Sequence, residues 1–135
     1  MNDDTKGTIS KMTGTPEDVI RGFAECLNRR DVDAALELYE PEATFVPEPG
    51  TPVIGRERIR EALERFAALK PTLTGEIQAV REGGDVALVL NRWHLEGQGP
   101  QGPVEMSGTS ADVLRRQEDD SWRVLIDDPW GGSIS

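Results

Sequence analysis

The sequence predicts an α+β domain in which helices come first and a mainly antiparallel sheet follows. Across the first half of the 135 residues, apolar side chains recur at helical spacing. After Pro71 the apolar period changes from about 3.6 to about 2, the period of half-buried strands. The connections are short, and the sequence shows no internal repeat and no linker. We therefore predict one domain, large enough to bury a core.

Caps and apolar stripes predict three helices. Thr15 is the expected N-cap of the first, with Pro16 in its first turn. The second is short, begins after Asp31, and ends at Pro41. The third runs from Gly55 to about Lys70. The predicted buried residues are Val19, Ile20, Phe23, Ala24 and Leu27 in the first helix, Ala35, Leu36 and Tyr39 in the second, and Ile59, Ala62, Leu63, Phe66 and Leu69 in the third.

The strands are predicted from alternation and from turn residues. Residues 43–46 predict a short edge strand that leads into an irregular loop rich in Pro and Gly. Residues 72–82 and 86–97 predict two strands joined by a Gly-Gly-Asp turn. A looser connection then leads into a C-terminal hairpin. Residues 1–14 are polar and are predicted to form a disordered tail, which leaves residues 15–135 as the folded domain.

Composition narrows the partners and the location. The formal net charge is −10, so we predict no nucleic-acid partner. No apolar run is long enough to cross a membrane, and residues 1–7 lack the basic and apolar regions of a signal peptide, so we predict a cytoplasmic location without a membrane partner. Cys26, the single cysteine, is predicted to be buried in the core.

The C-terminal hairpin carries the most informative polar residues. Two β-patterned runs, 107–116 and 122–130, flank a polar turn. If this turn centres on Asp119, residue 112 lies opposite residue 126, and residue 110 lies opposite residue 128. One face then carries Ser110, Asp112, Leu114, Val124, Ile126 and Asp128. Because most of this face is apolar, we predict that it forms one wall of a pocket.

Asp112 and Asp128 are therefore the first candidates for chemistry. Two carboxylates close together in a partly apolar pocket do not both ionise freely, so one proton is held to higher pH. The protonated group can donate, and its neighbour can accept a proton. The alternative is structural: Asp128 caps the turn at Pro129-Trp130, and Asp112 pairs with Arg116 or with a helix amide.

Several strings also resemble a known superfamily. They are LNRRD (27–31), LYEPEATF (38–45), IGRERI (54–59) and WRVLIDDPW (122–130), and they span about residues 16–132. In order and spacing the chain resembles the nuclear transport factor 2-like superfamily, in its SnoaL-like and ketosteroid isomerase-like branch. The resemblance implies a cone: a curved, mixed, mostly antiparallel sheet wrapped around three N-terminal helices, a cystatin-like α-β(4-6) roll. It also implies a ligand cavity at the open end and a homodimer through the sheet.

The resemblance argues against ketosteroid isomerisation itself. Those enzymes use an Asp base and an oxyanion hole made by a Tyr and a protonated Asp. The oxyanion-hole Asp falls on Asp112, but the Tyr falls on Phe23, which has no hydroxyl. The base falls on Pro47, or on Glu48 if the gap moves by one residue. One catalytic group is kept, one is lost, and one is ambiguous.

By the same resemblance, the face of the long strand that carries Asn91 and Trp93 lines the cavity, which leaves Arg92 and His94 outside. Trp93 and Trp130 offer flat apolar surface to a ligand. Tyr39 either reaches the cavity floor or packs with its hydroxyl at the rim. The sequence shows no second His and no clustered ligand set, so we predict neither a metal site nor a cofactor.

These residues are compatible with three functions. The first is a cofactor-independent isomerase, cyclase or dehydratase for a small, largely apolar molecule, with Glu48 or Asp128 as base and Asp112 as acid. The second is a protein that binds such a molecule without turning it over. The third is an association module whose sheet recruits a partner. The fold alone does not choose among them.

Overall fold

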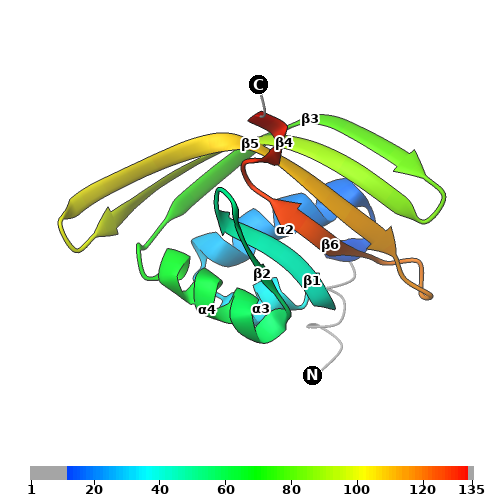
Figure 1. The fold of residues 1–135 in the computed structure, drawn as a ribbon, viewed down its shortest axis with the longest axis horizontal. Coiled ribbons are helices and arrows are strands. Elements are labelled where there is room, and N and C mark those ends of the chain that lie inside the picture. The colour runs from blue at the N-terminus through cyan, green and yellow to red at the C-terminus, as the bar shows by residue number, and fades with distance from the viewer. Residues whose placement is uncertain (1–11, 134–135) are drawn as a thin grey trace.

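A computed structural model describes residues 12–133. Three helices lie on the concave side of one curved, open sheet, and the strands arch over them (Figure 1). This confirms the predicted α+β cone. The helices are α2 (Pro16–Asn28), α3 (Val32–Leu36) and α4 (Arg56–Ala67), and the strands are β1 (Tyr39–Glu48), β2 (Thr51–Ile54), β3 (Thr72–Gly83), β4 (Val86–Gly99), β5 (Gly102–Arg116) and β6 (Trp122–Asp128). A short 3-10 helix, η1 (Gly131–Ser133), follows.

The sheet is mixed, as predicted. Its strand order is β2-β1-β6-β5-β4-β3. Every neighbouring pair is antiparallel except β1 and β6, which run parallel. The last strand thus inserts beside the first long one, and residues that are almost 90 positions apart, such as Tyr39 and Asp127, meet on one concave face.

The predicted helix starts are confirmed, but one helix end is wrong. The Thr15 hydroxyl accepts from the Asp18 amide at 3.1 Å, and the Asp31 carboxylate accepts from the Ala34 amide at 3.1 Å. The second helix ends at Leu36, not near Pro41, and Tyr39 already opens β1. The end was misplaced because Leu38 and Tyr39 are buried and extend the apolar pattern of the short helix into β1. Over so few residues, an apolar pattern fits the helical period and the strand period equally well.

The region after the first strand also differs from the prediction. The strand predicted at residues 43–46 is longer, Tyr39–Glu48, and lies between β2 and β6, so its prediction as a short edge strand was wrong. The irregular loop expected after it contains β2, which is the edge strand. An edge strand tolerates Pro52, which lacks a backbone donor. The pairing is irregular between Phe45 and Glu48, where the register shifts.

The predicted N-terminal tail lies mostly outside the described residues, which begin at residue 12. Met12 and Thr13 are buried, and Met12 packs over Gly22 so closely that an added Cβ there would meet its Cγ at 3.0 Å. The packed part of the domain therefore begins before residue 15.

The core fills the cone and holds α2 against the sheet. Tyr39, Ile59, Leu63, Val89 and Leu114 belong to the main buried cluster, and a smaller cluster gathers Leu27, Trp93 and Leu95. At the end of α2, the Asn28 side chain donates to the Leu73 carbonyl at 3.0 Å and accepts from the Leu73 amide at 2.6 Å. These two bonds fix α2 to β3 at one side of the cavity between this helix and the sheet.

The register of the last hairpin is confirmed at one end and wrong at the other. Leu114 lies opposite Val124, as expected for a turn centred on Asp119. A β-bulge then shifts the pairing by one residue, so Asp112 lies opposite Asp127 instead of residue 126. An extra residue in one strand exchanges the faces of all residues beyond it. Asp127 therefore turns inward, and Ile126 is 40% exposed.

Candidate functional site

A cavity of about 630 Å³ lies between α2 and the concave face of the sheet. Its walls are mainly apolar and aromatic side chains, with a few polar groups. The aromatic side chains and the main polar side chains that line it are Phe23, Tyr39, Phe45, Phe66, Asn91, Trp93, Ser110, Asp112, Asp127 and Trp130. Clefts of this size with few polar groups are typical of small-molecule sites.

A chain of hydrogen bonds links the polar groups of the cavity floor. The Tyr39 hydroxyl donates to Oδ2 of Asp127 at 2.6 Å, a length typical of a hydroxyl bound to an ionised carboxylate. The Ser110 hydroxyl donates to Oδ2 of Asp112 at 2.9 Å. Asp112 and Asp127 lie opposite each other on β5 and β6, and each carboxyl group perturbs the pKa of the other. Two buried carboxyl groups placed in this way hold one proton between them to higher pH.

Burial and like charge decide where that proton sits. Burial, followed by the charge of Asp127, raises the pKa of Asp112 well above its ordinary value. Burial also raises the pKa of Asp127, but hydrogen bonds from Asp112 and Tyr39 oppose this effect. The Oδ1 atom of Asp112 is buried and accepts no hydrogen bond from residues 12–133, so ionising this group is unfavourable. Of the two groups, Asp112 is thus the one that keeps its proton to higher pH, and Asp127 ionises first.

A second buried acid shows that burial alone does not produce this state. Glu40, the residue after Tyr39 on β1, is also buried, and a hydrogen bond from Arg115 lowers its pKa. The Asp112–Asp127 pair has no such cation among the groups that perturb it. In the Asp112–Asp127 pair, a proton bound by one carboxyl group reduces the buried negative charge, as Arg115 does for Glu40.

Aromatic rings form the rest of the wall. Trp93 and Trp130 meet edge to face with centroids 5.2 Å apart. Their indole N–H groups donate to the carbonyls of Pro129 and Val46 at 2.7 and 3.1 Å, so neither ring brings an unpaired donor to the cavity. Tyr39 stands edge-on to Phe23 and Phe45 at 6.1 and 6.4 Å.

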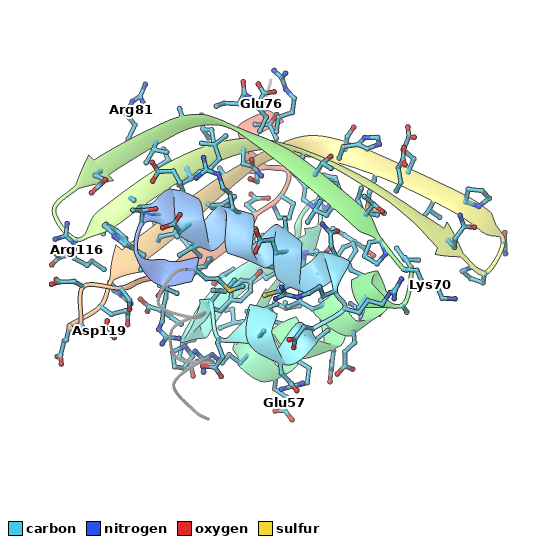
Figure 2. The ribbon with its side chains drawn as sticks, turned by 180° about the vertical axis from the view of Figure 1, so that it is seen from behind. Glu57, Lys70, Glu76, Arg81, Arg116 and Asp119 are labelled. Carbon is cyan, nitrogen blue, oxygen red and sulfur yellow. The ribbon has the colours of Figure 1, made fainter. Side chains whose placement is uncertain are left out.

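All the residues that were predicted to line the pocket do line this cavity, and so does Asp112. They are Phe23, Tyr39, Asn91, Trp93, Ser110 and Trp130. Two other residues predicted to be catalytic, Glu48 and Asp128, do not line it. Glu48 is exposed at the end of β1. Asp128 accepts from the backbone amide of Trp130 at 3.1 Å, which corresponds to the structural alternative, a cap on the turn. Arg116 does not pair with Asp112, since it approaches Glu82 and Asp85 at the sheet's end (Figure 2).

Asp127 is not among the site residues predicted from the sequence. The alternation of β6 placed it outward, and no turn or glycine marks the bulge at Leu125 that reverses it. The one available signal was the doubled acid at 127 and 128, since a one-residue slip turns one of the two inward in either register.

A group of possible metal ligands lies outside the cavity, and the expectation that no ligand set clusters was wrong. His94 Nε2 lies 3.3 Å from Glu96 Oε1 and 3.8 Å from Glu105 Oε2, on the outer face of β4 and β5. All three side chains are more than 40% exposed. The group is separate from the buried carboxyl pair.

Comparison with known proteins identifies the family. The SnoaL-like domain family matches residues 20–124, which run from within α2 to within β6 and include Asp112. The chain belongs to the SnoaL-like domain family. None of the curated proteins compared with it matches.

Solved structures show that this SnoaL-like domain has the nuclear transport factor 2-like fold. A nuclear transport factor 2-like superfamily protein from Salmonella enterica serovar Typhimurium is 18% identical, with a TM-score of 0.73 over 92% of this chain and 90% of that one. A conserved protein from Planctomyces limnophilus is 17% identical, with a TM-score of 0.74 over 82% and 88%. A protein of unknown function from Shewanella oneidensis is 20% identical, with a TM-score of 0.69 over 84% and 97%.

No helix within residues 12–133 of the SnoaL-like domain is both long and apolar enough to cross a membrane.

The buried pair makes a prediction about stability and pH. The pKa of Asp112 is about 4 in an unfolded chain and is raised in the folded domain. Its protonated form is therefore favoured by folding, and this contribution is lost as the pH rises from about 4 through the raised value. Asn at position 112 cannot ionise and can still donate to Asp127. At pH 7 the free energy of unfolding of Asp112→Asn is therefore expected to exceed that of the natural protein by on the order of 1–3 kcal/mol.

Urea unfolding of both proteins from pH 4 to pH 8 measures this effect. The free energy of unfolding of the natural protein is expected to fall more steeply with pH than that of Asp112→Asn. Equal slopes would mean that Asp112 titrates as an ordinary carboxyl group.

Proposed function

We propose that this SnoaL-like protein binds a small, largely apolar molecule in the cavity and carries out acid/base chemistry on it, of the isomerase, cyclase or dehydratase kind. The observation that carries the proposal is the buried pair of Asp112 and Asp127, which lie opposite each other on the floor of an aromatic cavity and whose pKa values are both raised. Strongly perturbed carboxyl groups in a cleft are typical of catalytic sites.

The geometry supports a division of roles. Asp127 is the base, because Tyr39 donates to it and so favours its ionised form. Asp112 is the donor, because its raised pKa keeps its proton at neutral pH. Asp127 removes a proton from a carbon next to a carbonyl group, and Asp112 turns its own proton from Asp127 to the oxygen that becomes negative. Asp127 replaces Glu48 and Asp128 in the base role.

The polar groups around the pair fit this role. Ser110 fixes one oxygen of Asp112 at 2.9 Å, which leaves the other side of the group for its proton. The Asn91 side-chain amide lines the cavity and makes no hydrogen bond to another residue in 12–133, so it is available to a ligand. The hydroxyl that Phe23 lacks is supplied to the pair from β1 by Tyr39.

Proton exchange tests the proposal. The full chain is incubated in deuterated water with cyclic ketones of one to three rings, and deuterium at the α-carbon is followed by mass spectrometry. Exchange above the buffer rate that is lost in Asp127→Asn supports the proposal. A ketone that binds, detected by calorimetry, without any exchange would leave ligand binding as the function.

An association role through the sheet is favoured by a separate observation. Leu88 and Ile126 are 39% and 40% exposed on the convex face, and both pair with Val113 in one row across β4, β5 and β6. We propose a homodimer through this face. A cytoplasmic location and the absence of a nucleic-acid partner stay predictions from composition.

Light scattering after size-exclusion chromatography measures the oligomeric state. The natural protein is expected to elute as a dimer and Leu88→Lys as a monomer. Ile54→Lys is the control, because Ile54 is 59% exposed on the edge strand β2, away from this row. A monomeric natural protein would contradict the dimer.

A further inference from the structure

The cavity carries a negative charge that the apolar walls do not balance. With one proton shared, Asp112 and Asp127 keep one negative charge between them at the floor. Within residues 12–133, Arg21 is the one basic side chain that lines the cavity, and it is exposed on α2, as is Glu25 one turn further along. The Glu76 side chain lies on the convex side of β3, away from the helices (Figure 2). The floor therefore has no cation of its own.

A neutral ligand leaves the Asp127 carboxylate without an opposite charge, so it is expected to bind less tightly than a cation of the same shape. It would exclude water from the Asp127 carboxylate and offer no charge in return, which is costly for a buried ion. An anionic ligand would meet the same carboxylate as a like charge. An ammonium group replaces the lost water with an opposite charge, and one positive charge matches the single negative charge of the pair.

The aromatic walls of the cavity also favour a ligand that carries an ammonium group. Six aromatic rings line the cavity, those of Phe23, Tyr39, Phe45, Phe66, Trp93 and Trp130. Both indole N–H groups are already bonded to backbone carbonyls, so the two rings offer a ligand aromatic surface without a free donor. Aromatic faces attract cations, and more strongly where water is excluded. A volume of about 630 Å³ holds a small ring system together with a short side arm.

We infer that the cavity takes a hydrophobic, singly protonated amine, with the ring system against the two tryptophans and the ammonium group at Asp127. This inference rests on the site of the proposed function and names its substrate class. Asp112 keeps its proton in the complex.

The expected pH dependence follows from the groups around Asp127. Tyr39 from β1 and Asp112 from β5 bond to it, Asp128 acts on it from the same strand, and Arg21 and Glu25 line the mouth from α2. Amine affinity is lost as the pH falls through the raised pKa of Asp127, because the carboxylate is neutralised. It is lost again as the pH rises through the pKa of the amine.

Three probes of one shape test the inference by calorimetry with the full chain: tryptamine, the corresponding alcohol tryptophol, and indole-3-propionate. Tryptamine is expected to bind at least about tenfold more tightly than tryptophol at pH 7, and indole-3-propionate most weakly. Asp127→Asn is expected to remove the preference for the amine, and Asp112→Asn, which leaves the Asp127 charge, is expected to keep it. If Asp127→Asn does not fold, the loss of preference in the natural protein at acid pH provides the same comparison.

The outcomes also separate this inference from the proposed function. Equal or tighter binding of tryptophol or of the carboxylate overturns the amine class, and so does the failure of all three probes to bind. Ketone exchange without an amine preference leaves the proposed function standing alone. An amine preference without exchange of any α-proton supports the amine class and contradicts the catalytic proposal.

Discussion

Asp127→Asn is expected to lower the rate of α-proton exchange by about 10²–10⁴-fold, the usual contribution of a positioned general base. Asn has the size of Asp and still accepts from the Tyr39 hydroxyl, which lies 2.6 Å from Oδ2 of Asp127. It cannot take a proton at neutral pH. The loss should therefore appear in the chemical step, and the affinity for a neutral ketone should change little.

Asp128→Asn is the matched control for this variant. Asp128 is the next residue, but its carboxylate accepts from the Trp130 amide and does not line the cavity. Its amide analogue keeps that acceptor, so exchange is expected to stay within about threefold of the natural rate. If Asp128→Asn loses exchange and Asp127→Asn retains it, the assignment of the base is wrong.

Phe45→Ala is expected to cost about 3–5 kcal/mol of the free energy of unfolding. The Phe45 ring is 3% exposed and stands between Tyr39 and Phe66, edge to face with both. Its removal deletes two ring contacts and leaves a void continuous with the cavity. This loss is a large part of the stability of a domain of ordinary size.

Urea unfolding measures the loss, with Phe45→Leu as the control. Leucine keeps most of the buried volume and loses only the ring geometry, so its cost should be less than half that of alanine. Similar costs for the two variants would show that the ring contacts, and not the filled volume, hold this part of the core.

The sequence predicted the fold well because its signals are local and agree with one another. Thr15 and Asp31 cap helices as expected, and Pro71 marks the change from helical spacing to strand alternation. The boundary at Tyr39 failed for a physical reason. A buried side chain next to a short helix satisfies the helical and the strand period equally well.

The candidate site was predicted only as far as alternation holds. Asp112 and Ser110 face the cavity because β5 keeps its register through them. Asp127 and Asp128 exchanged places because one extra residue in β6 reverses the faces beyond Leu125. A bulge depends on how the strand fits the curved sheet, and that fit is a property of the packed fold, which residues 122–128 do not specify by themselves.

The most direct test of the account is an NMR titration of the side-chain carboxyl carbons of Asp112 and Asp127. We expect the two signals to titrate as a coupled pair, with the pKa of Asp112 raised well above the ordinary value and with Asp127 ionising first. Asp127→Asn should then bring the pKa of Asp112 down, because the neighbouring charge is gone. Two independent carboxyl groups that both titrate near pH 4 would contradict the shared proton, and with it the acid/base site.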